Sequence, residues 1–383
     1  MKAAIGVLAA CLGAGAWLAG PPSGTPAAEA TWATGVHGAD SSRGSWNPKA
    51  AAAYLDYREN WWMGWPPAAR EHQTFCVSCH SAVPYALARP ALRGALAESA
   101  PSDNERRLLE NVRKRVRLGN DAGLFFTDKD EGAHKADESR GTESVLNALI
   151  LASDDARSGK LSDDARAAFR NMWAQQQTAG EKSGAWLWLR FNLQPWEADD
   201  SGYYGAVLAA VAAGTAPGNY RAAPEIQKNL DLLRQYLDRE YPQQSLINRA
   251  LLLWAGAKWP GLVTAERQAA LVGELASQQQ PDGGWSLTSL AGPWKRSDGT
   301  PLETKSDGYA TGLVTFALEQ AGLPPSNVHV KQGLAWLVAN QNAAEGLWPA
   351  YSPNRQRDPA TEIGRFMSDA ATAYAVLALT GTQ

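Results

Sequence analysis

Residues 75–85, with the sequence FCVSCHSAVPY, hold two cysteines and a histidine at a spacing that could do chemistry. Cys76-x-x-Cys79-His80 is the spacing of a covalent haem attachment site. Two thiols three positions apart on a helical turn can each add to one vinyl group of a haem, and the next residue then points its imidazole at the iron from the same face. We therefore predict one haem c, attached to Cys76 and Cys79, with His80 as an iron ligand.

Three other interpretations of this motif stay open at this stage. A structural zinc site needs four ligands, which Cys76, Cys79, His80 and His72 could supply. A redox-active disulfide of thioredoxin type requires a βαβ context, which the surrounding pattern does not show. The third interpretation is a chance or vestigial match.

The sixth iron ligand is less clear from the sequence. A thioether or a second imidazole in this position would set the potential and the spin state of the iron. No methionine falls between residues 80 and 171, so the usual arrangement of small cytochromes, with a methionine ligand downstream in the same domain, is not present. The candidates are Met63, His72 and Met367. A five-coordinate iron is the alternative, and it would favour chemistry over simple electron transfer.

The N-terminal sequence MKAAIGVLAACLGAGAWLAG has one lysine followed by an apolar stretch and a Pro/Gly break. Ala28-Glu29-Ala30 then fits a small-x-small cleavage site, so residues 1–30 are predicted to be a secretory signal peptide. A lipoprotein signal at Cys11 is a minor alternative. Cleavage would leave Cys76 and Cys79 as the cysteines of a periplasmic or secreted protein with no transmembrane domain.

The composition narrows the classes of partner. The chain of 383 residues has 36 basic and 39 acidic side chains, a balance that does not favour nucleic acid as a partner. Its 16 tryptophans must mostly be buried or line a binding cleft.

Beyond residue 100 the pattern predicts helices of two alternating kinds. One kind is apolar nearly all round, which is typical of a helix that is buried on all sides. The other is amphipathic and charged. Such an alternation at a long, nearly regular period indicates stacked helical hairpins, with apolar helices inside a ring of amphipathic ones. The predicted inner helices are 143–152, 200–214, 245–257, 307–322 and 369–381, and the outer ones are 104–118, 162–177, 224–239, 265–279 and 327–340.

A Gly-x-Trp turn precedes three of the inner helices and follows a glutamine at the end of an outer helix. The segments QQQPDGGW and NQNAAEGLW show this pattern. It resembles the Gln–Trp repeats of the terpenoid cyclase and prenyltransferase toroids, including the squalene–hopene cyclases. The resemblance covers residues 104–383 and implies that these turns are structural. The residues are Gln177, Gln280 and Gln341 with Trp186, Trp285 and Trp348.

The expected fold is therefore all-α, an α/α toroid of about five inner and outer helix pairs. We expect an N-terminal helical haem c segment over residues 31–103 to precede the toroid over residues 104–383. The chain also resembles exported bacterial proteins in which a CxxCH segment precedes a cyclase-like toroid.

Acidic residues stand at the starts of four predicted inner helices, where they would cap free backbone amides. Because inner helices of a toroid run parallel, these carboxylates should gather at one mouth of the ring. The residues are Glu143, Asp200, Asp307 and Asp369.

The segment Trp196-Glu197-Ala198-Asp199-Asp200 is a sharper feature. It is similar to the Asp-x-Asp-Asp motif of squalene–hopene cyclases, whose middle aspartate protonates an alkene, and Asp199 matches that position. Glu197 replaces the first aspartate, and this chain has room for one toroid rather than the two α-domains of those cyclases. Helix capping explains the same residues.

Two functions remain open from the sequence. In the first, an exported c-type haem protein transfers electrons, with a redox partner protein and a toroid that serves as a binding scaffold. In the second, a haem- or carboxylate-dependent enzyme acts on an apolar or polymeric substrate in the toroid, in a cyclase-like or lyase-like reaction. The complete haem motif favours the first.

Overall fold

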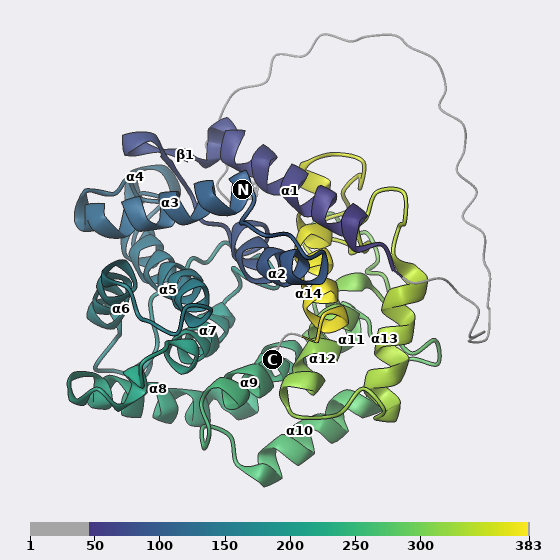
Figure 1. The fold of residues 1–383 in the computed structure, drawn as a ribbon. Helices are drawn as coiled ribbons and strands as arrows, with labels where there is room; N and C mark the ends of the chain where they lie inside the picture. The colour runs from purple at the N-terminus through teal and green to yellow at the C-terminus, as the bar shows by residue number, and fades with distance from the viewer. Residues whose placement is uncertain (1–45, 382–383) are drawn as a thin grey trace, which may run out of the picture.

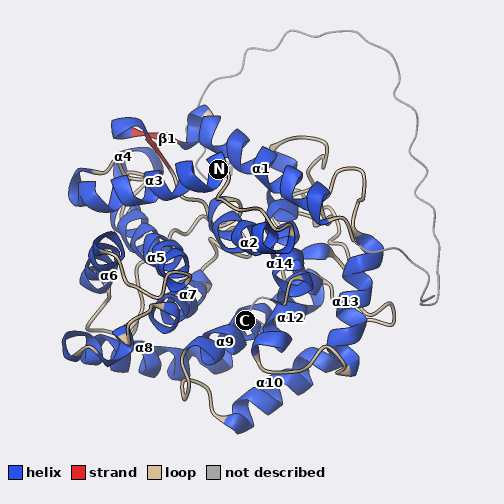
Figure 2. Cartoon of the chain, in the orientation of Figure 1, coloured by secondary structure: helices blue, strands red, loops and turns tan. Residues whose placement is uncertain are grey.

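The computed structural model describes residues 46–381, and in this part of the chain the helices form a closed double ring (Figure 1). The predicted signal peptide and Cys11 lie outside the described residues. Helices dominate, and the strands form one two-stranded hairpin (Figure 2). Its strands β1 and β2 are antiparallel, with Ala69 opposite Phe75.

The elements follow one another as outer and inner members of successive hairpins. They are α1 (Pro48–Gly64), β1 (Ala69–Arg70), β2 (Thr74–Phe75), α2 (Ala82–Ala95), α3 (Asp103–Leu118), α4 (Asp128–Glu131), α5 (Lys135–Ala156), α6 (Asp163–Gln175), α7 (Ser201–Thr215), α8 (Gln227–Glu240), α9 (Leu246–Lys258), α10 (Ala265–Ser277), α11 (Leu287–Ala291), α12 (Gly308–Gln320), α13 (Val328–Asn340) and α14 (Phe366–Leu379).

The inner ring consists of α2, α5, α7, α9, α12 and α14, each in contact with the next. Helix α2 packs between α14 and α5 and so closes the ring (Figure 1). The protein is therefore an all-α toroid, as the sequence predicted. The ring described over residues 46–381 has six pairs rather than the expected five, because α1 and α2 supply one of them. The predicted boundary at residue 103 thus falls between two hairpins of one ring.

Sequence patterning did not identify α2 as an inner helix because its composition is unusual for one. It contains Pro84 near its start and Pro90 in its interior, and proline removes a backbone donor from a helix. Its buried face also includes Arg89, which is tied to Asp56 and Glu98.

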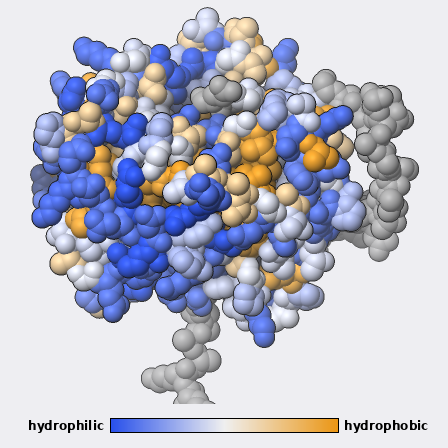
Figure 3. Space-filling model, turned by 90° about the horizontal axis from the view of Figure 1, so that it is seen from below, coloured by the Kyte–Doolittle hydropathy of each residue, from blue (hydrophilic) through white to orange (hydrophobic). Residues whose placement is uncertain are grey.

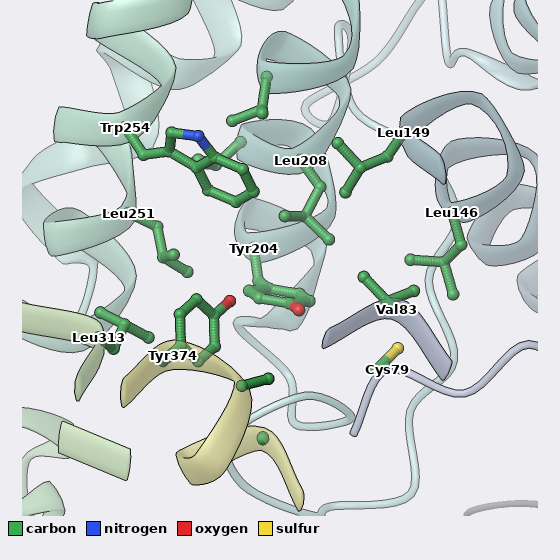
Figure 4. Packing of buried hydrophobic residues seen from close by; sticks show 14 of the residues in the cluster. Cys79, Val83, Leu146, Leu149, Tyr204, Leu208, Leu251, Trp254, Leu313 and Tyr374 are labelled. Atoms are coloured by element: carbon green, nitrogen blue, oxygen red, sulfur yellow. The ribbon is translucent and has the colours of Figure 1, made fainter. Parts of the chain in front are cut away.

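The centre of the ring is filled by side chains from the inner helices. Leu149 from α5, Leu208 from α7 and Leu251 from α9 converge there (Figure 4). Because the inner helices are covered on every side, their apolar residues are almost fully removed from water. Each fully buried leucine of this kind contributes about 1.5–3 kcal/mol to folding.

The three Gly-x-Trp turns are structural, as expected. The indoles of Trp186, Trp285 and Trp348 are buried, and each donates a hydrogen bond of 2.7 Å to a backbone carbonyl of the preceding outer helix. Gly184 has a φ of 99°, and a Cβ there would meet the carbonyl of Leu232 at 2.1 Å, so the turn requires glycine.

A glutamine at each turn binds the next outer helix, although two of the three are not the predicted residues. The Nε2 atom of Gln176, rather than that of Gln177, donates to the carbonyls of Gly184 and Asn229. Gln279, rather than Gln280, does the same for Gly283 and for the first turn of α13.

Gln341 closes the ring through the same kind of contact. Its Nε2 donates to the carbonyls of Gly346 and Asn47, and its Oε1 accepts from the Asn47 amide at 2.6 Å. Asn47 is the N-cap of α1, so the last repeat is fastened to the first as the repeats are to each other. This confirms that α1 belongs to the outer ring.

The side of the ring drawn in Figure 3 is largely hydrophilic, with small apolar patches between charged groups. Across the described residues, the helices are too short or too polar to cross a bilayer.

Candidate functional site

The CxxCH motif lies in the loop that enters α2, at the end of the ring where the inner helices begin. The β1–β2 hairpin leads into it, and the Cys76 amide donates to the carbonyl of Ala68 at 2.8 Å. Cys76, Cys79 and His80 are all buried. The motif is therefore an internal part of the toroid wall rather than a surface loop.

Cys79 is a free thiol that faces the centre of the ring. It lies in the same cluster as Val83, Tyr204 and Tyr374 (Figure 4). Burial raises the pKa of this thiol well above its ordinary value, and the nearby Glu197 carboxylate adds to the shift. The thiol is consequently protonated at neutral pH.

Serine side chains set the shape of the motif. The Ser78 hydroxyl accepts hydrogen bonds from the amides of Ser81 and Ala82, at 3.2 and 3.0 Å, and so satisfies free donors at the start of α2. On the other side, the Trp62 indole donates to the carbonyl of Cys76 at 2.8 Å. These bonds fix the backbone between the first cysteine and the histidine.

A chain of hydrogen bonds orients the His80 ring. The Ser81 hydroxyl lies 2.9 Å from His80 Nδ1 and 2.8 Å from Oδ2 of Asp369. Since a carboxylate can only accept, the Ser81 proton points to Asp369 and the serine oxygen accepts from Nδ1–H. The imidazole proton is therefore on Nδ1, and Nε2 carries a lone pair.

Asp369 is held as an acceptor by two more residues. Arg58 donates from Nε at 2.7 Å and from Nη2 at 3.0 Å, and the Tyr54 hydroxyl donates at 2.8 Å. Burial raises the pKa of Asp369, and the ion pair with Arg58 opposes that shift. Arg58 also binds Glu362, so this one arginine of α1 ties α1 both to Asp369 in α14 and to the segment that precedes α14.

His80 Nε2 is buried and has no hydrogen-bond partner among the described residues. Burial, with a smaller effect of the Arg58 charge, lowers the pKa of His80 to about 3, so the ring is neutral. Phe366 stacks on it with ring centroids 4.0 Å apart, and Trp62 meets it edge-on at 5.0 Å. A neutral imidazole with a free nitrogen in an aromatic surrounding is suited to bind a metal.

Two cavities meet at His80 and Glu197, which line both. The mouth cavity, of about 40 Å³, is lined by His80, Trp196, Glu197, Arg357, Phe366 and Met367, together with smaller polar groups. The motif cavity, of about 10 Å³, borders Cys76, Cys79, His80, Phe126, Leu189 and Glu197. Both cavities are far smaller than small-molecule sites, which have roughly 300–1,000 Å³.

The predicted haem finds two of its three attachment groups at adjoining cavities, the unpaired nitrogen of His80 and the thiol of Cys79. Cys76 is disulfide-bonded in this structure, so haem attachment would require that bond to be reduced and the cavity walls to move apart. The zinc interpretation lacks its ligand set, since no group of three or more His, Cys, Asp or Glu side chains suited to a metal is found among the described residues. His72 is exposed in the short 3₁₀ helix Glu71–Gln73.

The candidates for a sixth ligand lie in different places. Met367 is buried near the start of α14 and lines the mouth cavity beside His80. Met63 is half-buried near the end of α1 and lines neither cavity. The exposed His72 lines neither of them.

The acidic segment before α7 contains one carboxylate at the cavities. Glu197 borders both of them, and burial raises its pKa to about 8, with the Lys135 charge opposing the shift. Asp199 is exposed. Asp200 occupies the N-cap of α7 without capping it through its side chain, and instead accepts from Asn248 at 3.1 Å.

The remaining carboxylates of the expected rim are engaged separately. Asp307 caps α12 by accepting from the amide of Ala310, and burial raises its pKa to about 6. Glu143 is not at a helix start, because α5 begins at Lys135, and it pairs with Arg115 instead. Of the four, Asp369 alone is linked to His80, through Ser81.

The sequence did not reveal the residues that orient His80 without being part of the CxxCH motif. Arg58, Tyr54 and Ser81 join His80 to Asp369 across nearly the whole chain, and no local pattern marks such a contact. Glu59, whose two carboxylate oxygens are buried without a hydrogen-bond partner, had no sequence signal at all.

No model of a known protein family matches this chain, and no curated protein matches it. Among solved structures, a wild-type glycosidase superposes with a TM-score of 0.47 at 13% sequence identity, covering 90% of this chain and 99% of its own. A glycosidase variant in complex with glucose gives a TM-score of 0.48 at 14% identity, with the same coverage. Such low scores transfer no activity to this chain.

Proposed function

We propose that this protein is an exported c-type haem protein with a role in electron transfer. Cys76 and Cys79 hold one haem through thioether bonds, and His80 binds its iron through Nε2. When bound, the haem supplies a one-electron couple. The observation that carries the proposal is the buried Nε2 of His80, which has no hydrogen-bond partner while Nδ1 is tied to Ser81.

This observation matters because a buried polar atom without a partner is costly. Leaving such a group unsatisfied costs about 1–3 kcal/mol. Here the cost is built into the fold, since the Ser81–Asp369–Arg58 chain holds the ring in one orientation. Histidines that bind a metal typically donate their other ring N–H to a carboxylate, a backbone carbonyl or a water, and this partner fixes the tautomer and raises the basicity of the ligand.

The residues around His80 and the ring of helices supply two further features that a haem protein needs, an apolar environment and a rigid support for the motif. The aromatic rings of Phe366, Trp62 and Trp196 limit water at His80, which favours a defined potential. The toroid acts as the scaffold that holds the motif between its first and last hairpins. A redox partner protein would have to approach the mouth of the ring at which the inner helices begin.

The test is expression in a periplasm that contains cytochrome c maturation machinery, followed by an absorption spectrum and a pyridine haemochrome assay. The wild-type protein should show the α-band of a c-type haem. The double variant Cys76→Ala/Cys79→Ala should lose it, whereas Ser289→Ala, in the distant α11, should keep it. A wild-type protein with full maturation machinery and no band would overturn the proposal.

A second candidate function rests on Glu197. A half-buried carboxyl group whose pKa is raised to about 8, at the junction of two cavities, has the properties of a general acid at neutral pH. In this alternative the protein is an enzyme that protonates a substrate in the mouth cavity. Turnover of a candidate polyene or polysaccharide that is abolished by Glu197→Gln, and kept by Asp199→Asn, would favour it.

A further inference from the structure

A third cavity lies between the outer helices α3 and α6 and the inner helix α5, which all pack against one another. We call it the α3–α6 cavity. Its volume of about 300 Å³ reaches the range of small-molecule sites, roughly 300–1,000 Å³. Within the described residues, it shares no lining residue with the mouth cavity or the motif cavity. Its polar lining includes Asn120, Arg140, Glu143, Asn147, Asn171 and Gln175.

The inner wall of this cavity contains an acceptor that has no donor. Asn147 on α5 is 5% exposed, and its Oδ1 is buried without a hydrogen-bond partner among the described residues. Its Nδ2 donates to Glu143 at 3.3 Å, which leaves the oxygen for another donor. Because a buried acceptor without a partner is costly, this position suits a ligand group that donates, such as a hydroxyl.

The same wall contains a cation that has no counter-ion. Arg140 is half-buried, forms no salt bridge with a described residue, and donates to Asn120 at 3.3 Å. Arg115, which also lines the cavity, differs because it is paired with Glu143 through two hydrogen bonds. The guanidinium of Arg140 therefore has N–H groups available for a planar anion, and a carboxylate matches their geometry.

The wall formed by α6 consists of amide side chains. Asn171 and Gln175 make no side-chain hydrogen bond within the described part of the chain, whereas Asn229 on the next outer helix donates to Gln176. An amide side chain both donates and accepts, as a hydroxyl group does. No aromatic ring is among the described side chains that line the cavity, so a flat aromatic ligand would have no ring to stack on.

We propose that the α3–α6 cavity binds a small sugar acid, a polyhydroxylated carboxylate with the size of one sugar ring. Its carboxylate pairs with Arg140, and one of its hydroxyl groups donates to Oδ1 of Asn147. Its other hydroxyl groups bond to the amides of Asn171 and Gln175. This binding site goes beyond the proposed function, because it lies outside the two cavities at His80.

Isothermal titration calorimetry of the full chain with D-glucuronate and D-glucose tests the site. The wild-type protein should bind glucuronate more tightly than glucose. Arg140→Gln should weaken glucuronate by about tenfold or more, the value of a hydrogen bond to a charged group, and leave glucose nearly unchanged. Asn147→Leu should weaken both probes by about threefold to tenfold, since both carry hydroxyl groups.

Two further variants control for folding and for position. Ala174 is exposed and lines the cavity, so Ala174→Trp should fill it and abolish binding without disturbing the buried core. Arg157→Gln, just beyond the end of α5, removes an arginine that does not line the cavity and should leave both affinities unchanged.

The outcomes separate this inference from the proposed function. A wild-type protein that binds neither probe overturns the site, as does binding that survives in Ala174→Trp. Glucuronate binding that is unchanged in Arg140→Gln overturns the role of that arginine, and unchanged binding in Asn147→Leu overturns the role of the amide. The absorption spectrum that tests for haem should be the same in Ala174→Trp as in the wild type, so either proposal can fail while the other stands.

Discussion

The Gln–Trp turns and the CxxCH mouth are built from similar materials, yet they differ in how their polar groups are satisfied. At the turns, the side-chain N–H groups of Trp186 and Gln176 donate hydrogen bonds to backbone carbonyls. At the mouth, His80 Nε2 and one nitrogen of Arg357 are buried without partners, as are both carboxylate oxygens of Glu59 on α1. Both regions are rich in buried aromatic rings, so burial alone does not distinguish them.

This difference indicates that the Gln–Trp turns belong to the scaffold and that the CxxCH mouth is the candidate site. A repeated contact whose polar atoms are all paired stabilises the ring and needs nothing further. A cluster of buried atoms without partners lowers stability and indicates a ligand or a reaction. The Arg58–Asp369 pair stands between these two types, because it is fully paired and yet holds His80.

The largest expected loss of stability is that of Arg58→Met. It leaves the Asp369 carboxylate buried without its cation, and breaking a buried pair in this way costs about 3–5 kcal/mol. Urea unfolding of the two proteins measures this difference. Arg117→Met removes an ion pair with Asp164 in which the arginine is 68% exposed, and should cost far less because water screens the pair. Equal losses in the two variants would contradict the comparison.

Gln176→Ala should have the next largest effect. It removes hydrogen bonds to Gly184 and Asn229 and leaves buried carbonyls unsatisfied, at a cost of about 1–3 kcal/mol. Gln177 makes no side-chain hydrogen bond within the described part of the chain, so Gln177→Ala should cost much less. Thermal unfolding of both variants decides which glutamine fastens the repeat.

Glu59 should make stability depend on pH. Burial, with the Asp369 charge, raises its pKa to about 8, whereas the unfolded chain has a pKa of about 4.3. Between these values the folded state binds one more proton than the unfolded state. The contribution of Glu59 to stability is therefore full below the lower value and decreases by about 1.4 kcal/mol per pH unit as the pH rises to the upper one.

Glu59→Gln should remove this dependence, because glutamine does not titrate. Unfolding free energies measured at several pH values between these limits give the slope for both proteins. The same slope in the variant would mean that Glu59 is paired in solution and does not belong with the unsatisfied buried groups.

The smallest effect belongs to a helix cap of the scaffold. Ser102 begins α3 and accepts from the Glu105 amide, while the Glu105 side chain accepts from the Ser102 amide at 2.7 Å. Ser102→Ala should cost about 1 kcal/mol, as is usual for an N-cap serine. Its chevron or melting curve should otherwise keep its shape. A loss of stability as large as that of Arg58→Met would show that Ser102 does more than cap the start of α3.

The toroid could be predicted because its signal is local and repeated. Apolar helices such as α7 and α12 can be recognised from short windows, since each is buried on all sides. The Gly-x-Trp turns are equally local. The sixth pair could not be found in this way, because Pro84, Pro90 and the buried Arg89 interrupt the apolar helical pattern by which an inner helix is recognised.

The sequence by itself determined the alternation of helices, the Gly-x-Trp turns and the prediction that Cys76, Cys79 and His80 bind haem. The tertiary structure decided what surrounds His80. Asp369 lies 288 positions after Ser81 along the chain, and Met367 and Arg357 reach the same cavity because the ring closes its last hairpin on its first. The physical reason is that patterns within a helix report local burial, whereas a ring closure joins residues that share no local pattern.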